Sequence, residues 1–148
     1  MATIYNETTI SAEKDRVWDI LTNLDLLEKY DPTVKKSVVI SPQKTGIDAK
    51  RKVHMADGKN WFEERVTEFD PGTALTFELT ACSFPVERLK HSYSFEQVGN
   101  QTKVKQVMNY TVKFGLFGKL LDAVMIRKQS DAGIKKFMSG LKTISEKT

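Results

Sequence analysis

The sequence predicts an α+β domain in which an antiparallel sheet of about seven strands is covered by a long C-terminal helix. Between residues 34 and 112, apolar side chains recur at every second position and short turn sequences such as Asp57-Gly58 separate the runs. This pattern is typical of consecutive antiparallel strands. From Gly115 to Glu146 the apolar side chains recur with the spacing of a helix instead. Because one face of such a sheet must be buried, we expect this helix to cover it.

The N-terminal part of the chain is expected to contain one strand and two short helices. Residues 2–10 alternate and are rich in β-branched side chains, which favours a strand. Ser11 is expected to cap a short helix that buries Trp18, and Asp25 to cap a second helix that runs to Tyr30. Asp31-Pro32 ends that helix, because the residue before a proline avoids the helical backbone conformation.

The remaining strands follow from alternating apolar residues between turn signals. They are predicted at residues 34–41, 49–55, 60–69, 74–82, 86–97 and 102–112. Short connections between consecutive strands imply that these strands pair antiparallel.

The C-terminal helix is amphipathic, but its apolar face is not uniform. That face carries Leu116, Leu120, Ala123, Val124, Ile134, Phe137, Met138, Leu141 and Ile144. Arg127, Ser130 and Asp131 interrupt it, and Gly133 and Gly140 also lie on it. Polar and small residues on an inward face indicate that the helix covers a cavity. The alternative is that the Arg127 side chain extends to the helix edge and that the glycines allow close packing.

Composition and charge exclude several classes of protein. With 148 residues, 40% hydrophobic and 28% charged, the chain is expected to form a single globular domain over residues 1–148. One cysteine excludes an intrachain disulfide and suits a reducing compartment, and with only two histidines we expect no metal site. The net charge of +4 is spread among interleaved Lys and Glu, which favours a solvated surface over nucleic-acid binding.

Membrane insertion and secretion are not expected. No run of 18 apolar residues is present, so no transmembrane segment is predicted. The N-terminal residues lack the basic and apolar regions of a secretory signal, and a cytoplasmic location is therefore expected. The sequence does not determine the oligomeric state.

Several segments together resemble the START-like helix-grip superfamily (SRPBCC), in its polyketide cyclase/dehydrase and lipid-transport branch. They are Ile10-Ser11-Ala12, Val17-Trp18-Asp19-Ile20-Leu21, Tyr30-Asp31-Pro32, Glu64-Arg65-Val66-Thr67-Glu68-Phe69-Asp70-Pro71 and Lys113-Phe114-Gly115. The resemblance covers nearly the whole chain. It implies a helix-grip fold, in which a curved sheet wraps around the C-terminal helix with an apolar cavity between them. The same architecture hosts lipid carriers, plant hormone and allergen proteins, and polyketide aromatases, so it indicates the fold more than the activity.

Strand alternation predicts which side chains line the interior. In the strand at 60–69, Phe62, Glu64 and Val66 are expected to face inward, although an early bulge would reverse this choice. The predicted ligand-binding residues are Arg51, Glu64, Phe77, Leu89, His91, Tyr93, Gln106, Met108, Tyr110 and Arg127.

Two interpretations fit the polar members of this set. Charges in a dry core are costly unless they are paired. The first interpretation is a structural network, in which Glu64 pairs with Arg51 or Arg127 and His91 bonds to a tyrosine hydroxyl. The second, which we favour, is an apolar ligand pocket with a few converging polar groups. For His91 alone, a satisfied core histidine is favoured over a catalytic base.

The function that this pattern favours is binding of a hydrophobic small molecule, such as a lipid, a quinone or a polyketide-like compound, by a carrier or sensor without a cofactor. Arg51 or Arg127 would hold a polar head group, while Phe77, Leu89 and Met108 would bury the hydrocarbon part.

Two alternatives remain open at this stage. One is a polyketide cyclase or dehydratase that uses Arg51, His91 and Tyr93, although no set of catalytic residues is recognisable. The other is a module that contacts a partner protein or a membrane surface. Its candidate residues are apolar side chains at the start of the C-terminal helix, among lysines: Phe114, Leu116, Phe117, Leu120 and Leu121.

Overall fold

The predicted α+β fold is confirmed by a computed structural model, which describes residues 2–113, 115 and 125–147. Its described strands are β1 (Ala2–Ile10), β2 (Val34–Val39), β3 (Lys50–Met55), β4 (Trp61–Asp70), β5 (Ala74–Cys82), β6 (Val86–Val98) and β7 (Gln101–Val112). Its described helices are α1 (Lys14–Thr22), the 3-10 helix η1 (Leu24–Lys29) and α3 (Arg127–Glu146). The beginning of the predicted C-terminal helix lies outside the described residues.

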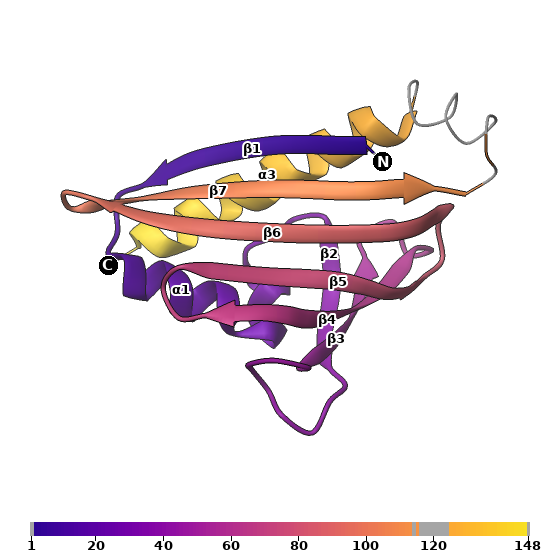
Figure 1. Cartoon of the computed structure of the whole chain (residues 1–148), viewed down its shortest axis with the longest axis horizontal. Coiled ribbons are helices and arrows are strands. Elements are labelled where there is room, and N and C mark those ends of the chain that lie inside the picture. The colour runs from indigo at the N-terminus through magenta and orange to yellow at the C-terminus, as the bar shows by residue number, and fades with distance from the viewer. Residues whose placement is uncertain (1, 114, 116–124, 148) are drawn as a thin grey trace.

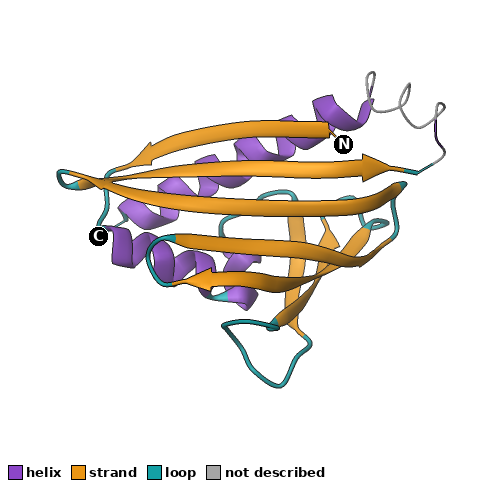
Figure 2. Cartoon of the chain, viewed as in Figure 1, coloured by secondary structure: helices purple, strands orange, loops and turns teal. Residues whose placement is uncertain are grey.

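The described strands form one antiparallel sheet in the order β1-β7-β6-β5-β4-β3-β2 (Figure 1). Pairing of β1 with β7 brings the N-terminal strand beside the last one, so that β1 and β2 are the two edges. The helices lie on one face of the sheet, with α3 crossing behind the long strands (Figure 2). Every predicted strand is confirmed, with ends that differ by at most two residues.

The two predicted helix caps are wrong. Helix α1 begins at Lys14 with Glu13 at its N-cap, and no side chain caps it. The Ser11 amide instead donates to Glu146 Oε2 at 2.8 Å, and the Ser11 hydroxyl accepts from Gln101 Nε2 at 3.1 Å. Asp25 lies within the first turn of η1 and does not precede it. For Ser11, contacts with distant parts of the chain therefore take the place of a local cap.

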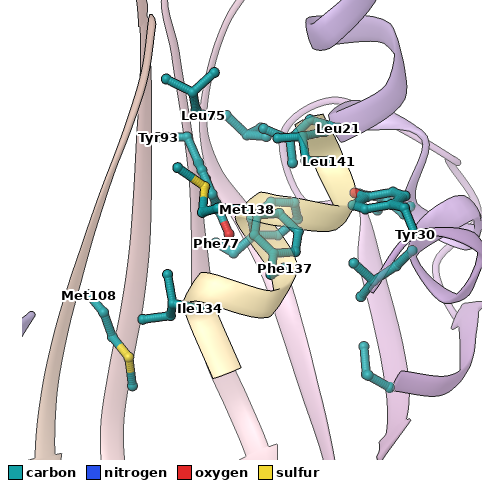
Figure 3. Close-up of a cluster of buried hydrophobic side chains, with 14 of the residues drawn as sticks. Leu21, Tyr30, Leu75, Phe77, Tyr93, Met108, Ile134, Phe137, Met138 and Leu141 are labelled. Atoms are coloured by element: carbon teal, nitrogen blue, oxygen red, sulfur yellow. The ribbon is translucent and has the colours of Figure 1, made fainter. Parts of the chain in front are cut away.

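The core between sheet and helices is aromatic at its centre. Trp18 is buried as predicted, with its ring edge-on to Phe69 at 5.1 Å and to Phe95 at 5.4 Å between ring centroids. Phe137 of α3 lies between Tyr93 of the sheet and Tyr30 of the η1–β2 connection, at 5.8 and 5.7 Å (Figure 3). The C-terminal half of α3 is thus fixed from both sides.

The two glycines of α3 have different roles. A side chain at Gly140 would overlap the backbone carbonyl oxygen of Tyr30, so the absence of a Cβ lets α3 approach the end of η1. A Cβ built at Gly133 has no heavy atom within 4 Å, and Gly133 faces the cavity described below. Close packing and cavity formation, offered by the sequence as alternatives, therefore both occur on the same helix.

Gly140→Ala is expected to lower the free energy of unfolding by about 3 kcal/mol, the upper end for overpacking, because the obstacle is backbone. Gly133→Ala is the matched control and should raise it by roughly 0.5–1 kcal/mol, since alanine favours the helix and meets no atom. Urea unfolding of both variants measures the difference. Equal effects of the two substitutions would contradict the close contact at Gly140.

Candidate functional site

A cavity of about 570 Å³ lies between the sheet and the N-terminal half of α3. Its walls are mainly apolar. The sheet contributes Met55, Phe62, Leu79, Val86, Leu89 and Met108, and the helix contributes Ile126, Gly133, Ile134 and Phe137. Figure 3 shows Ile134 of α3 and Met108 of the sheet near one another at this end of the core. A volume of several hundred Å³ with an apolar lining suits a small hydrophobic molecule.

Arg51 and Glu64 form a buried ion pair in the cavity wall. They are directly opposite each other on β3 and β4, and their side chains are only 5% and 3% exposed. Arg51 Nη2 lies 2.6 Å from Glu64 Oε1, and Arg51 Nε donates to the same oxygen at 2.7 Å. The third nitrogen, Nη1, faces the carbonyl oxygen of Leu24 at 3.4 Å. The guanidinium is therefore already surrounded by acceptors from the protein.

The surroundings of Arg51 keep it charged. Burial alone would lower the pKa of the guanidinium, but the adjacent Glu64 carboxylate, together with Tyr30 and Tyr93, raises that pKa above its usual value. The Phe77 ring adds a cation–π contact, with its centroid 4.4 Å from the guanidinium carbon. Arg51 and Glu64 thus contribute no net charge to the wall of the cavity.

His91 and Gln106 form a second polar pair, on β6 and β7. Gln106 Nε2 lies 2.6 Å from His91 Nδ1. In this orientation of the amide its NH₂ group donates, so Nδ1 accepts and the imidazole proton lies on Nε2. Burial lowers the pKa of His91, and the opposing effect of the Glu64 charge, which the Arg51 charge partly offsets, is smaller than that of burial. His91 is therefore neutral near pH 7.

Two further polar side chains lie at the cavity. Burial raises the pKa of the Tyr93 phenol, which stacks near His91 with 6.5 Å between ring centroids. Burial also raises the pKa of the Asp31 carboxyl, whose Oδ1 accepts hydrogen bonds from the amide and hydroxyl of Thr33 at 2.9 and 2.7 Å. The cavity therefore combines one paired cation, one neutral histidine, a phenol and three carboxyl groups, those of Glu64, Asp31 and Asp57.

The sequence model of the family described as polyketide cyclase/dehydrase and lipid transport matches residues 1–146 of the chain. The chain belongs to this family. A comparison with curated protein sequences finds no significant match.

Solved structures share the fold of this member of the polyketide cyclase/dehydrase and lipid-transport family at low sequence identity. A protein from Thermus thermophilus is 21% identical, with a TM-score of 0.81 over 96% of this chain and 95% of that chain. A START superfamily protein from Mycobacterium smegmatis is 12% identical, with a TM-score of 0.80 over 97% of each chain. The Zhui aromatase/cyclase from Streptomyces sp. R1128 is 14% identical, with a TM-score of 0.80 over 98% of this chain and 93% of that chain.

The predicted helix-grip fold and family resemblance are both confirmed. The family model places the chain in the polyketide cyclase/dehydrase and lipid-transport family, and the solved structures show the fold that it shares with them. Among the described residues, no helix is long and apolar enough to cross a membrane, and no three His, Cys, Asp or Glu side chains could hold a metal ion.

Most of the predicted site residues of this family member lie together. The cavity is lined by Arg51, Glu64, Leu89, His91, Tyr93, Gln106 and Met108. Phe77 and Tyr110 are buried but do not line the cavity. The Phe77 ring contacts the Arg51 guanidinium through its face. Phe62 and Glu64 face inward as predicted, since the register shift between Glu63 and Glu64 places its extra residue, Thr80, in β5 and leaves the alternation of β4 intact.

The prediction that Arg127 lies in the interior is wrong. Its side chain is exposed, and Nη1 donates to the carbonyl oxygen of Thr3 on the edge strand β1 at 3.0 Å. The alternative interpretation, in which this arginine extends to the helix edge, describes its position. A guanidinium near the start of α3 can reach both water and an edge carbonyl, and so avoids the cost of burial. The candidate membrane-contact residues at 114 and 116–121 lie outside the described residues.

The expected network around His91 also differs from the prediction. Its hydrogen-bond partner is the Gln106 amide and not a tyrosine hydroxyl. Sequence reasoning missed Asp31 altogether as a cavity residue, having assigned Asp31-Pro32 only to the end of a helix. The signal available in the sequence was a charged residue between Tyr30 and Val34, two residues that can be buried.

Proposed function

We propose that this protein binds a hydrophobic small molecule in the cavity under α3 and acts as its carrier or sensor. One observation carries the proposal: a cavity of about 570 Å³ has mainly apolar walls, with polar side chains among them. Gly133 supports it further, because a glycine inside α3 costs helix stability while the space beside it stays open. Burial of hydrocarbon against these walls would be the main source of affinity.

A catalytic role as a cyclase or dehydratase has weaker support. In the mechanism predicted from the sequence, Arg51 would hold a carbonyl oxygen of the substrate. Its nitrogens instead face Glu64 and the Leu24 carbonyl oxygen. His91 and Tyr93 line the cavity, but a binding role already accounts for their position. We therefore propose binding without turnover.

The test is to fill the cavity from the helix. Gly133→Phe should weaken binding of the neutral fluorescent probe N-phenyl-1-naphthylamine at least about tenfold, because the new ring occupies the space beside Gly133. Ser139→Phe, at an exposed position of the same helix, is the matched control and should leave affinity unchanged. Probe fluorescence measures affinity, and native mass spectrometry should count one probe per chain.

Unchanged affinity in Gly133→Phe would place the probe elsewhere and overturn the proposal. Failure of the wild-type protein to bind the probe would overturn it as well. Far-UV circular dichroism and urea unfolding of both variants separate a filled cavity from a lost fold.

A further inference from the structure

Gln106 carries a buried polar atom that no described residue satisfies. This residue is 1% exposed and lines the cavity. The amide nitrogen is engaged with His91, while the amide oxygen, Oε1, has no hydrogen-bond partner among the described residues. An unsatisfied buried acceptor of this kind destabilises the folded protein, because it has lost its hydrogen bonds to water without replacement. A ligand that supplies a donor at this point would provide the replacement.

The neighbours of Gln106 present both donors and acceptors to the same space. His91 carries its proton on Nε2, and this nitrogen makes no hydrogen bond to a described residue. Tyr93, directly opposite Gln106 on β6, lines the cavity, and its hydroxyl has no described partner either.

Gln106 and His91 together still present a donor and an acceptor to the cavity if the Gln106 amide is rotated. Rotation by 180° would make Oε1 accept from a proton on Nδ1 of His91, leaving the amide nitrogen as donor and His91 Nε2 as acceptor. In either arrangement the pair offers one unpaired donor and one unpaired acceptor. A hydroxyl group, which both donates and accepts, satisfies both arrangements.

Anionic groups fit this part of the cavity poorly. Both bonds from Arg51 to Glu64 end on Oε1, and no described residue bonds to Oε2 of the carboxylate. Asp31 and Asp57 add two more carboxyl groups to the lining. A ligand carboxylate would therefore meet acceptors and like charge, without an unpaired cation among the described cavity residues to compensate.

We propose that the ligand is an uncharged molecule with a hydroxyl group, and that Gln106, His91 and Tyr93 bind this hydroxyl. This inference rests on the proposed function and specifies the chemical class of the ligand. The hydrocarbon part would lie against Leu89, Met108 and Ile134, which line the same cavity. Specificity would then come from hydrogen bonds at one end and affinity from apolar burial along the rest.

Three probes that differ only in their polar end test the inference. Decan-1-ol, decyl methyl ether and decanoate are compared at pH 7.5 by displacement of N-phenyl-1-naphthylamine from the wild-type protein. Decan-1-ol should displace the probe at concentrations about tenfold lower than either of the others. The ether is the more hydrophobic molecule and lacks the donor, so apolar burial alone would rank it above the alcohol.

A substitution then locates the hydroxyl. Gln106→Met removes the amide at similar volume and should reduce the preference for decan-1-ol over the ether to about twofold or less, while binding of the fluorescent probe persists. Gln43→Met makes the same chemical change at an exposed residue outside the cavity lining and should keep the preference. If Gln106→Met does not fold, the wild-type ranking of the three probes decides alone.

The possible results separate this inference from the function on which it rests. Equal or tighter binding of the ether, or of decanoate, would overturn the hydroxyl assignment and leave the hydrophobic pocket standing. So would an unchanged preference in a folded Gln106→Met protein. Failure of the wild-type protein to bind the fluorescent probe would overturn both.

Discussion

Arg51→Met is expected to lower the free energy of unfolding by about 3–5 kcal/mol. The substitution leaves the Glu64 carboxylate buried, 3% exposed, without the two guanidinium contacts at 2.6 and 2.7 Å that now neutralise it. It also removes the cation over the Phe77 ring. Urea unfolding at pH 7 measures the loss.

The double variant Arg51→Met/Glu64→Leu is the control for this effect. Replacing both partners of a buried ion pair by apolar side chains is often neutral or stabilising, so most of the loss should be recovered. A single variant that loses less than about 1 kcal/mol would show that Glu64 is well solvated, contrary to its burial. A double variant as unstable as the single one would show that Arg51 stabilises the fold by packing and not by charge.

Trp18→Ala is expected to cost about 3–5 kcal/mol, as for other large-to-small substitutions of a buried aromatic residue. Trp18 is 8% exposed and makes edge-on contacts with Phe69 of β4 and Phe95 of β6, so its loss opens a gap between α1 and the sheet. Denaturant unfolding measures the cost. Trp61→Ala is the comparison, because Trp61 is half-buried at the surface beside Lys52 and should cost less. A smaller loss at position 18 than at position 61 would contradict the core packing described above.

The alternation of apolar residues along the strands was sufficient to predict most of the residues that line the cavity. In a strand the facing of each side chain alternates, so a single apolar neighbour such as Leu89 assigns His91 and Tyr93 to the same face. The same rule placed Arg51 and Glu64 in the interior, and their pairing followed from the cost of burying a lone charge.

Periodicity did not predict the position of a polar group at the end of a long side chain or in an irregular segment. Arg127 occupies the apolar stripe of α3 by spacing, but its flexible stem carries the charge to the sheet edge at Thr3. Asp31 belongs to a connection without a period, so no pattern indicated which way its carboxyl points. The His91–Gln106 contact joins neighbouring strands diagonally, and alternation alone does not reveal which of several inward polar groups will meet.

Because the two halves of α3 are packed differently, substitutions in one half and in the other have different consequences. Around Gly140 and Phe137 the helix is held against the Tyr30 backbone and two aromatic rings, so substitutions there act on folding. From Ile126 to Gly133 the helix borders open space, where a larger or smaller side chain changes the shape of the cavity with little effect on packing. One half of the helix can therefore vary in shape while the other half maintains the fold.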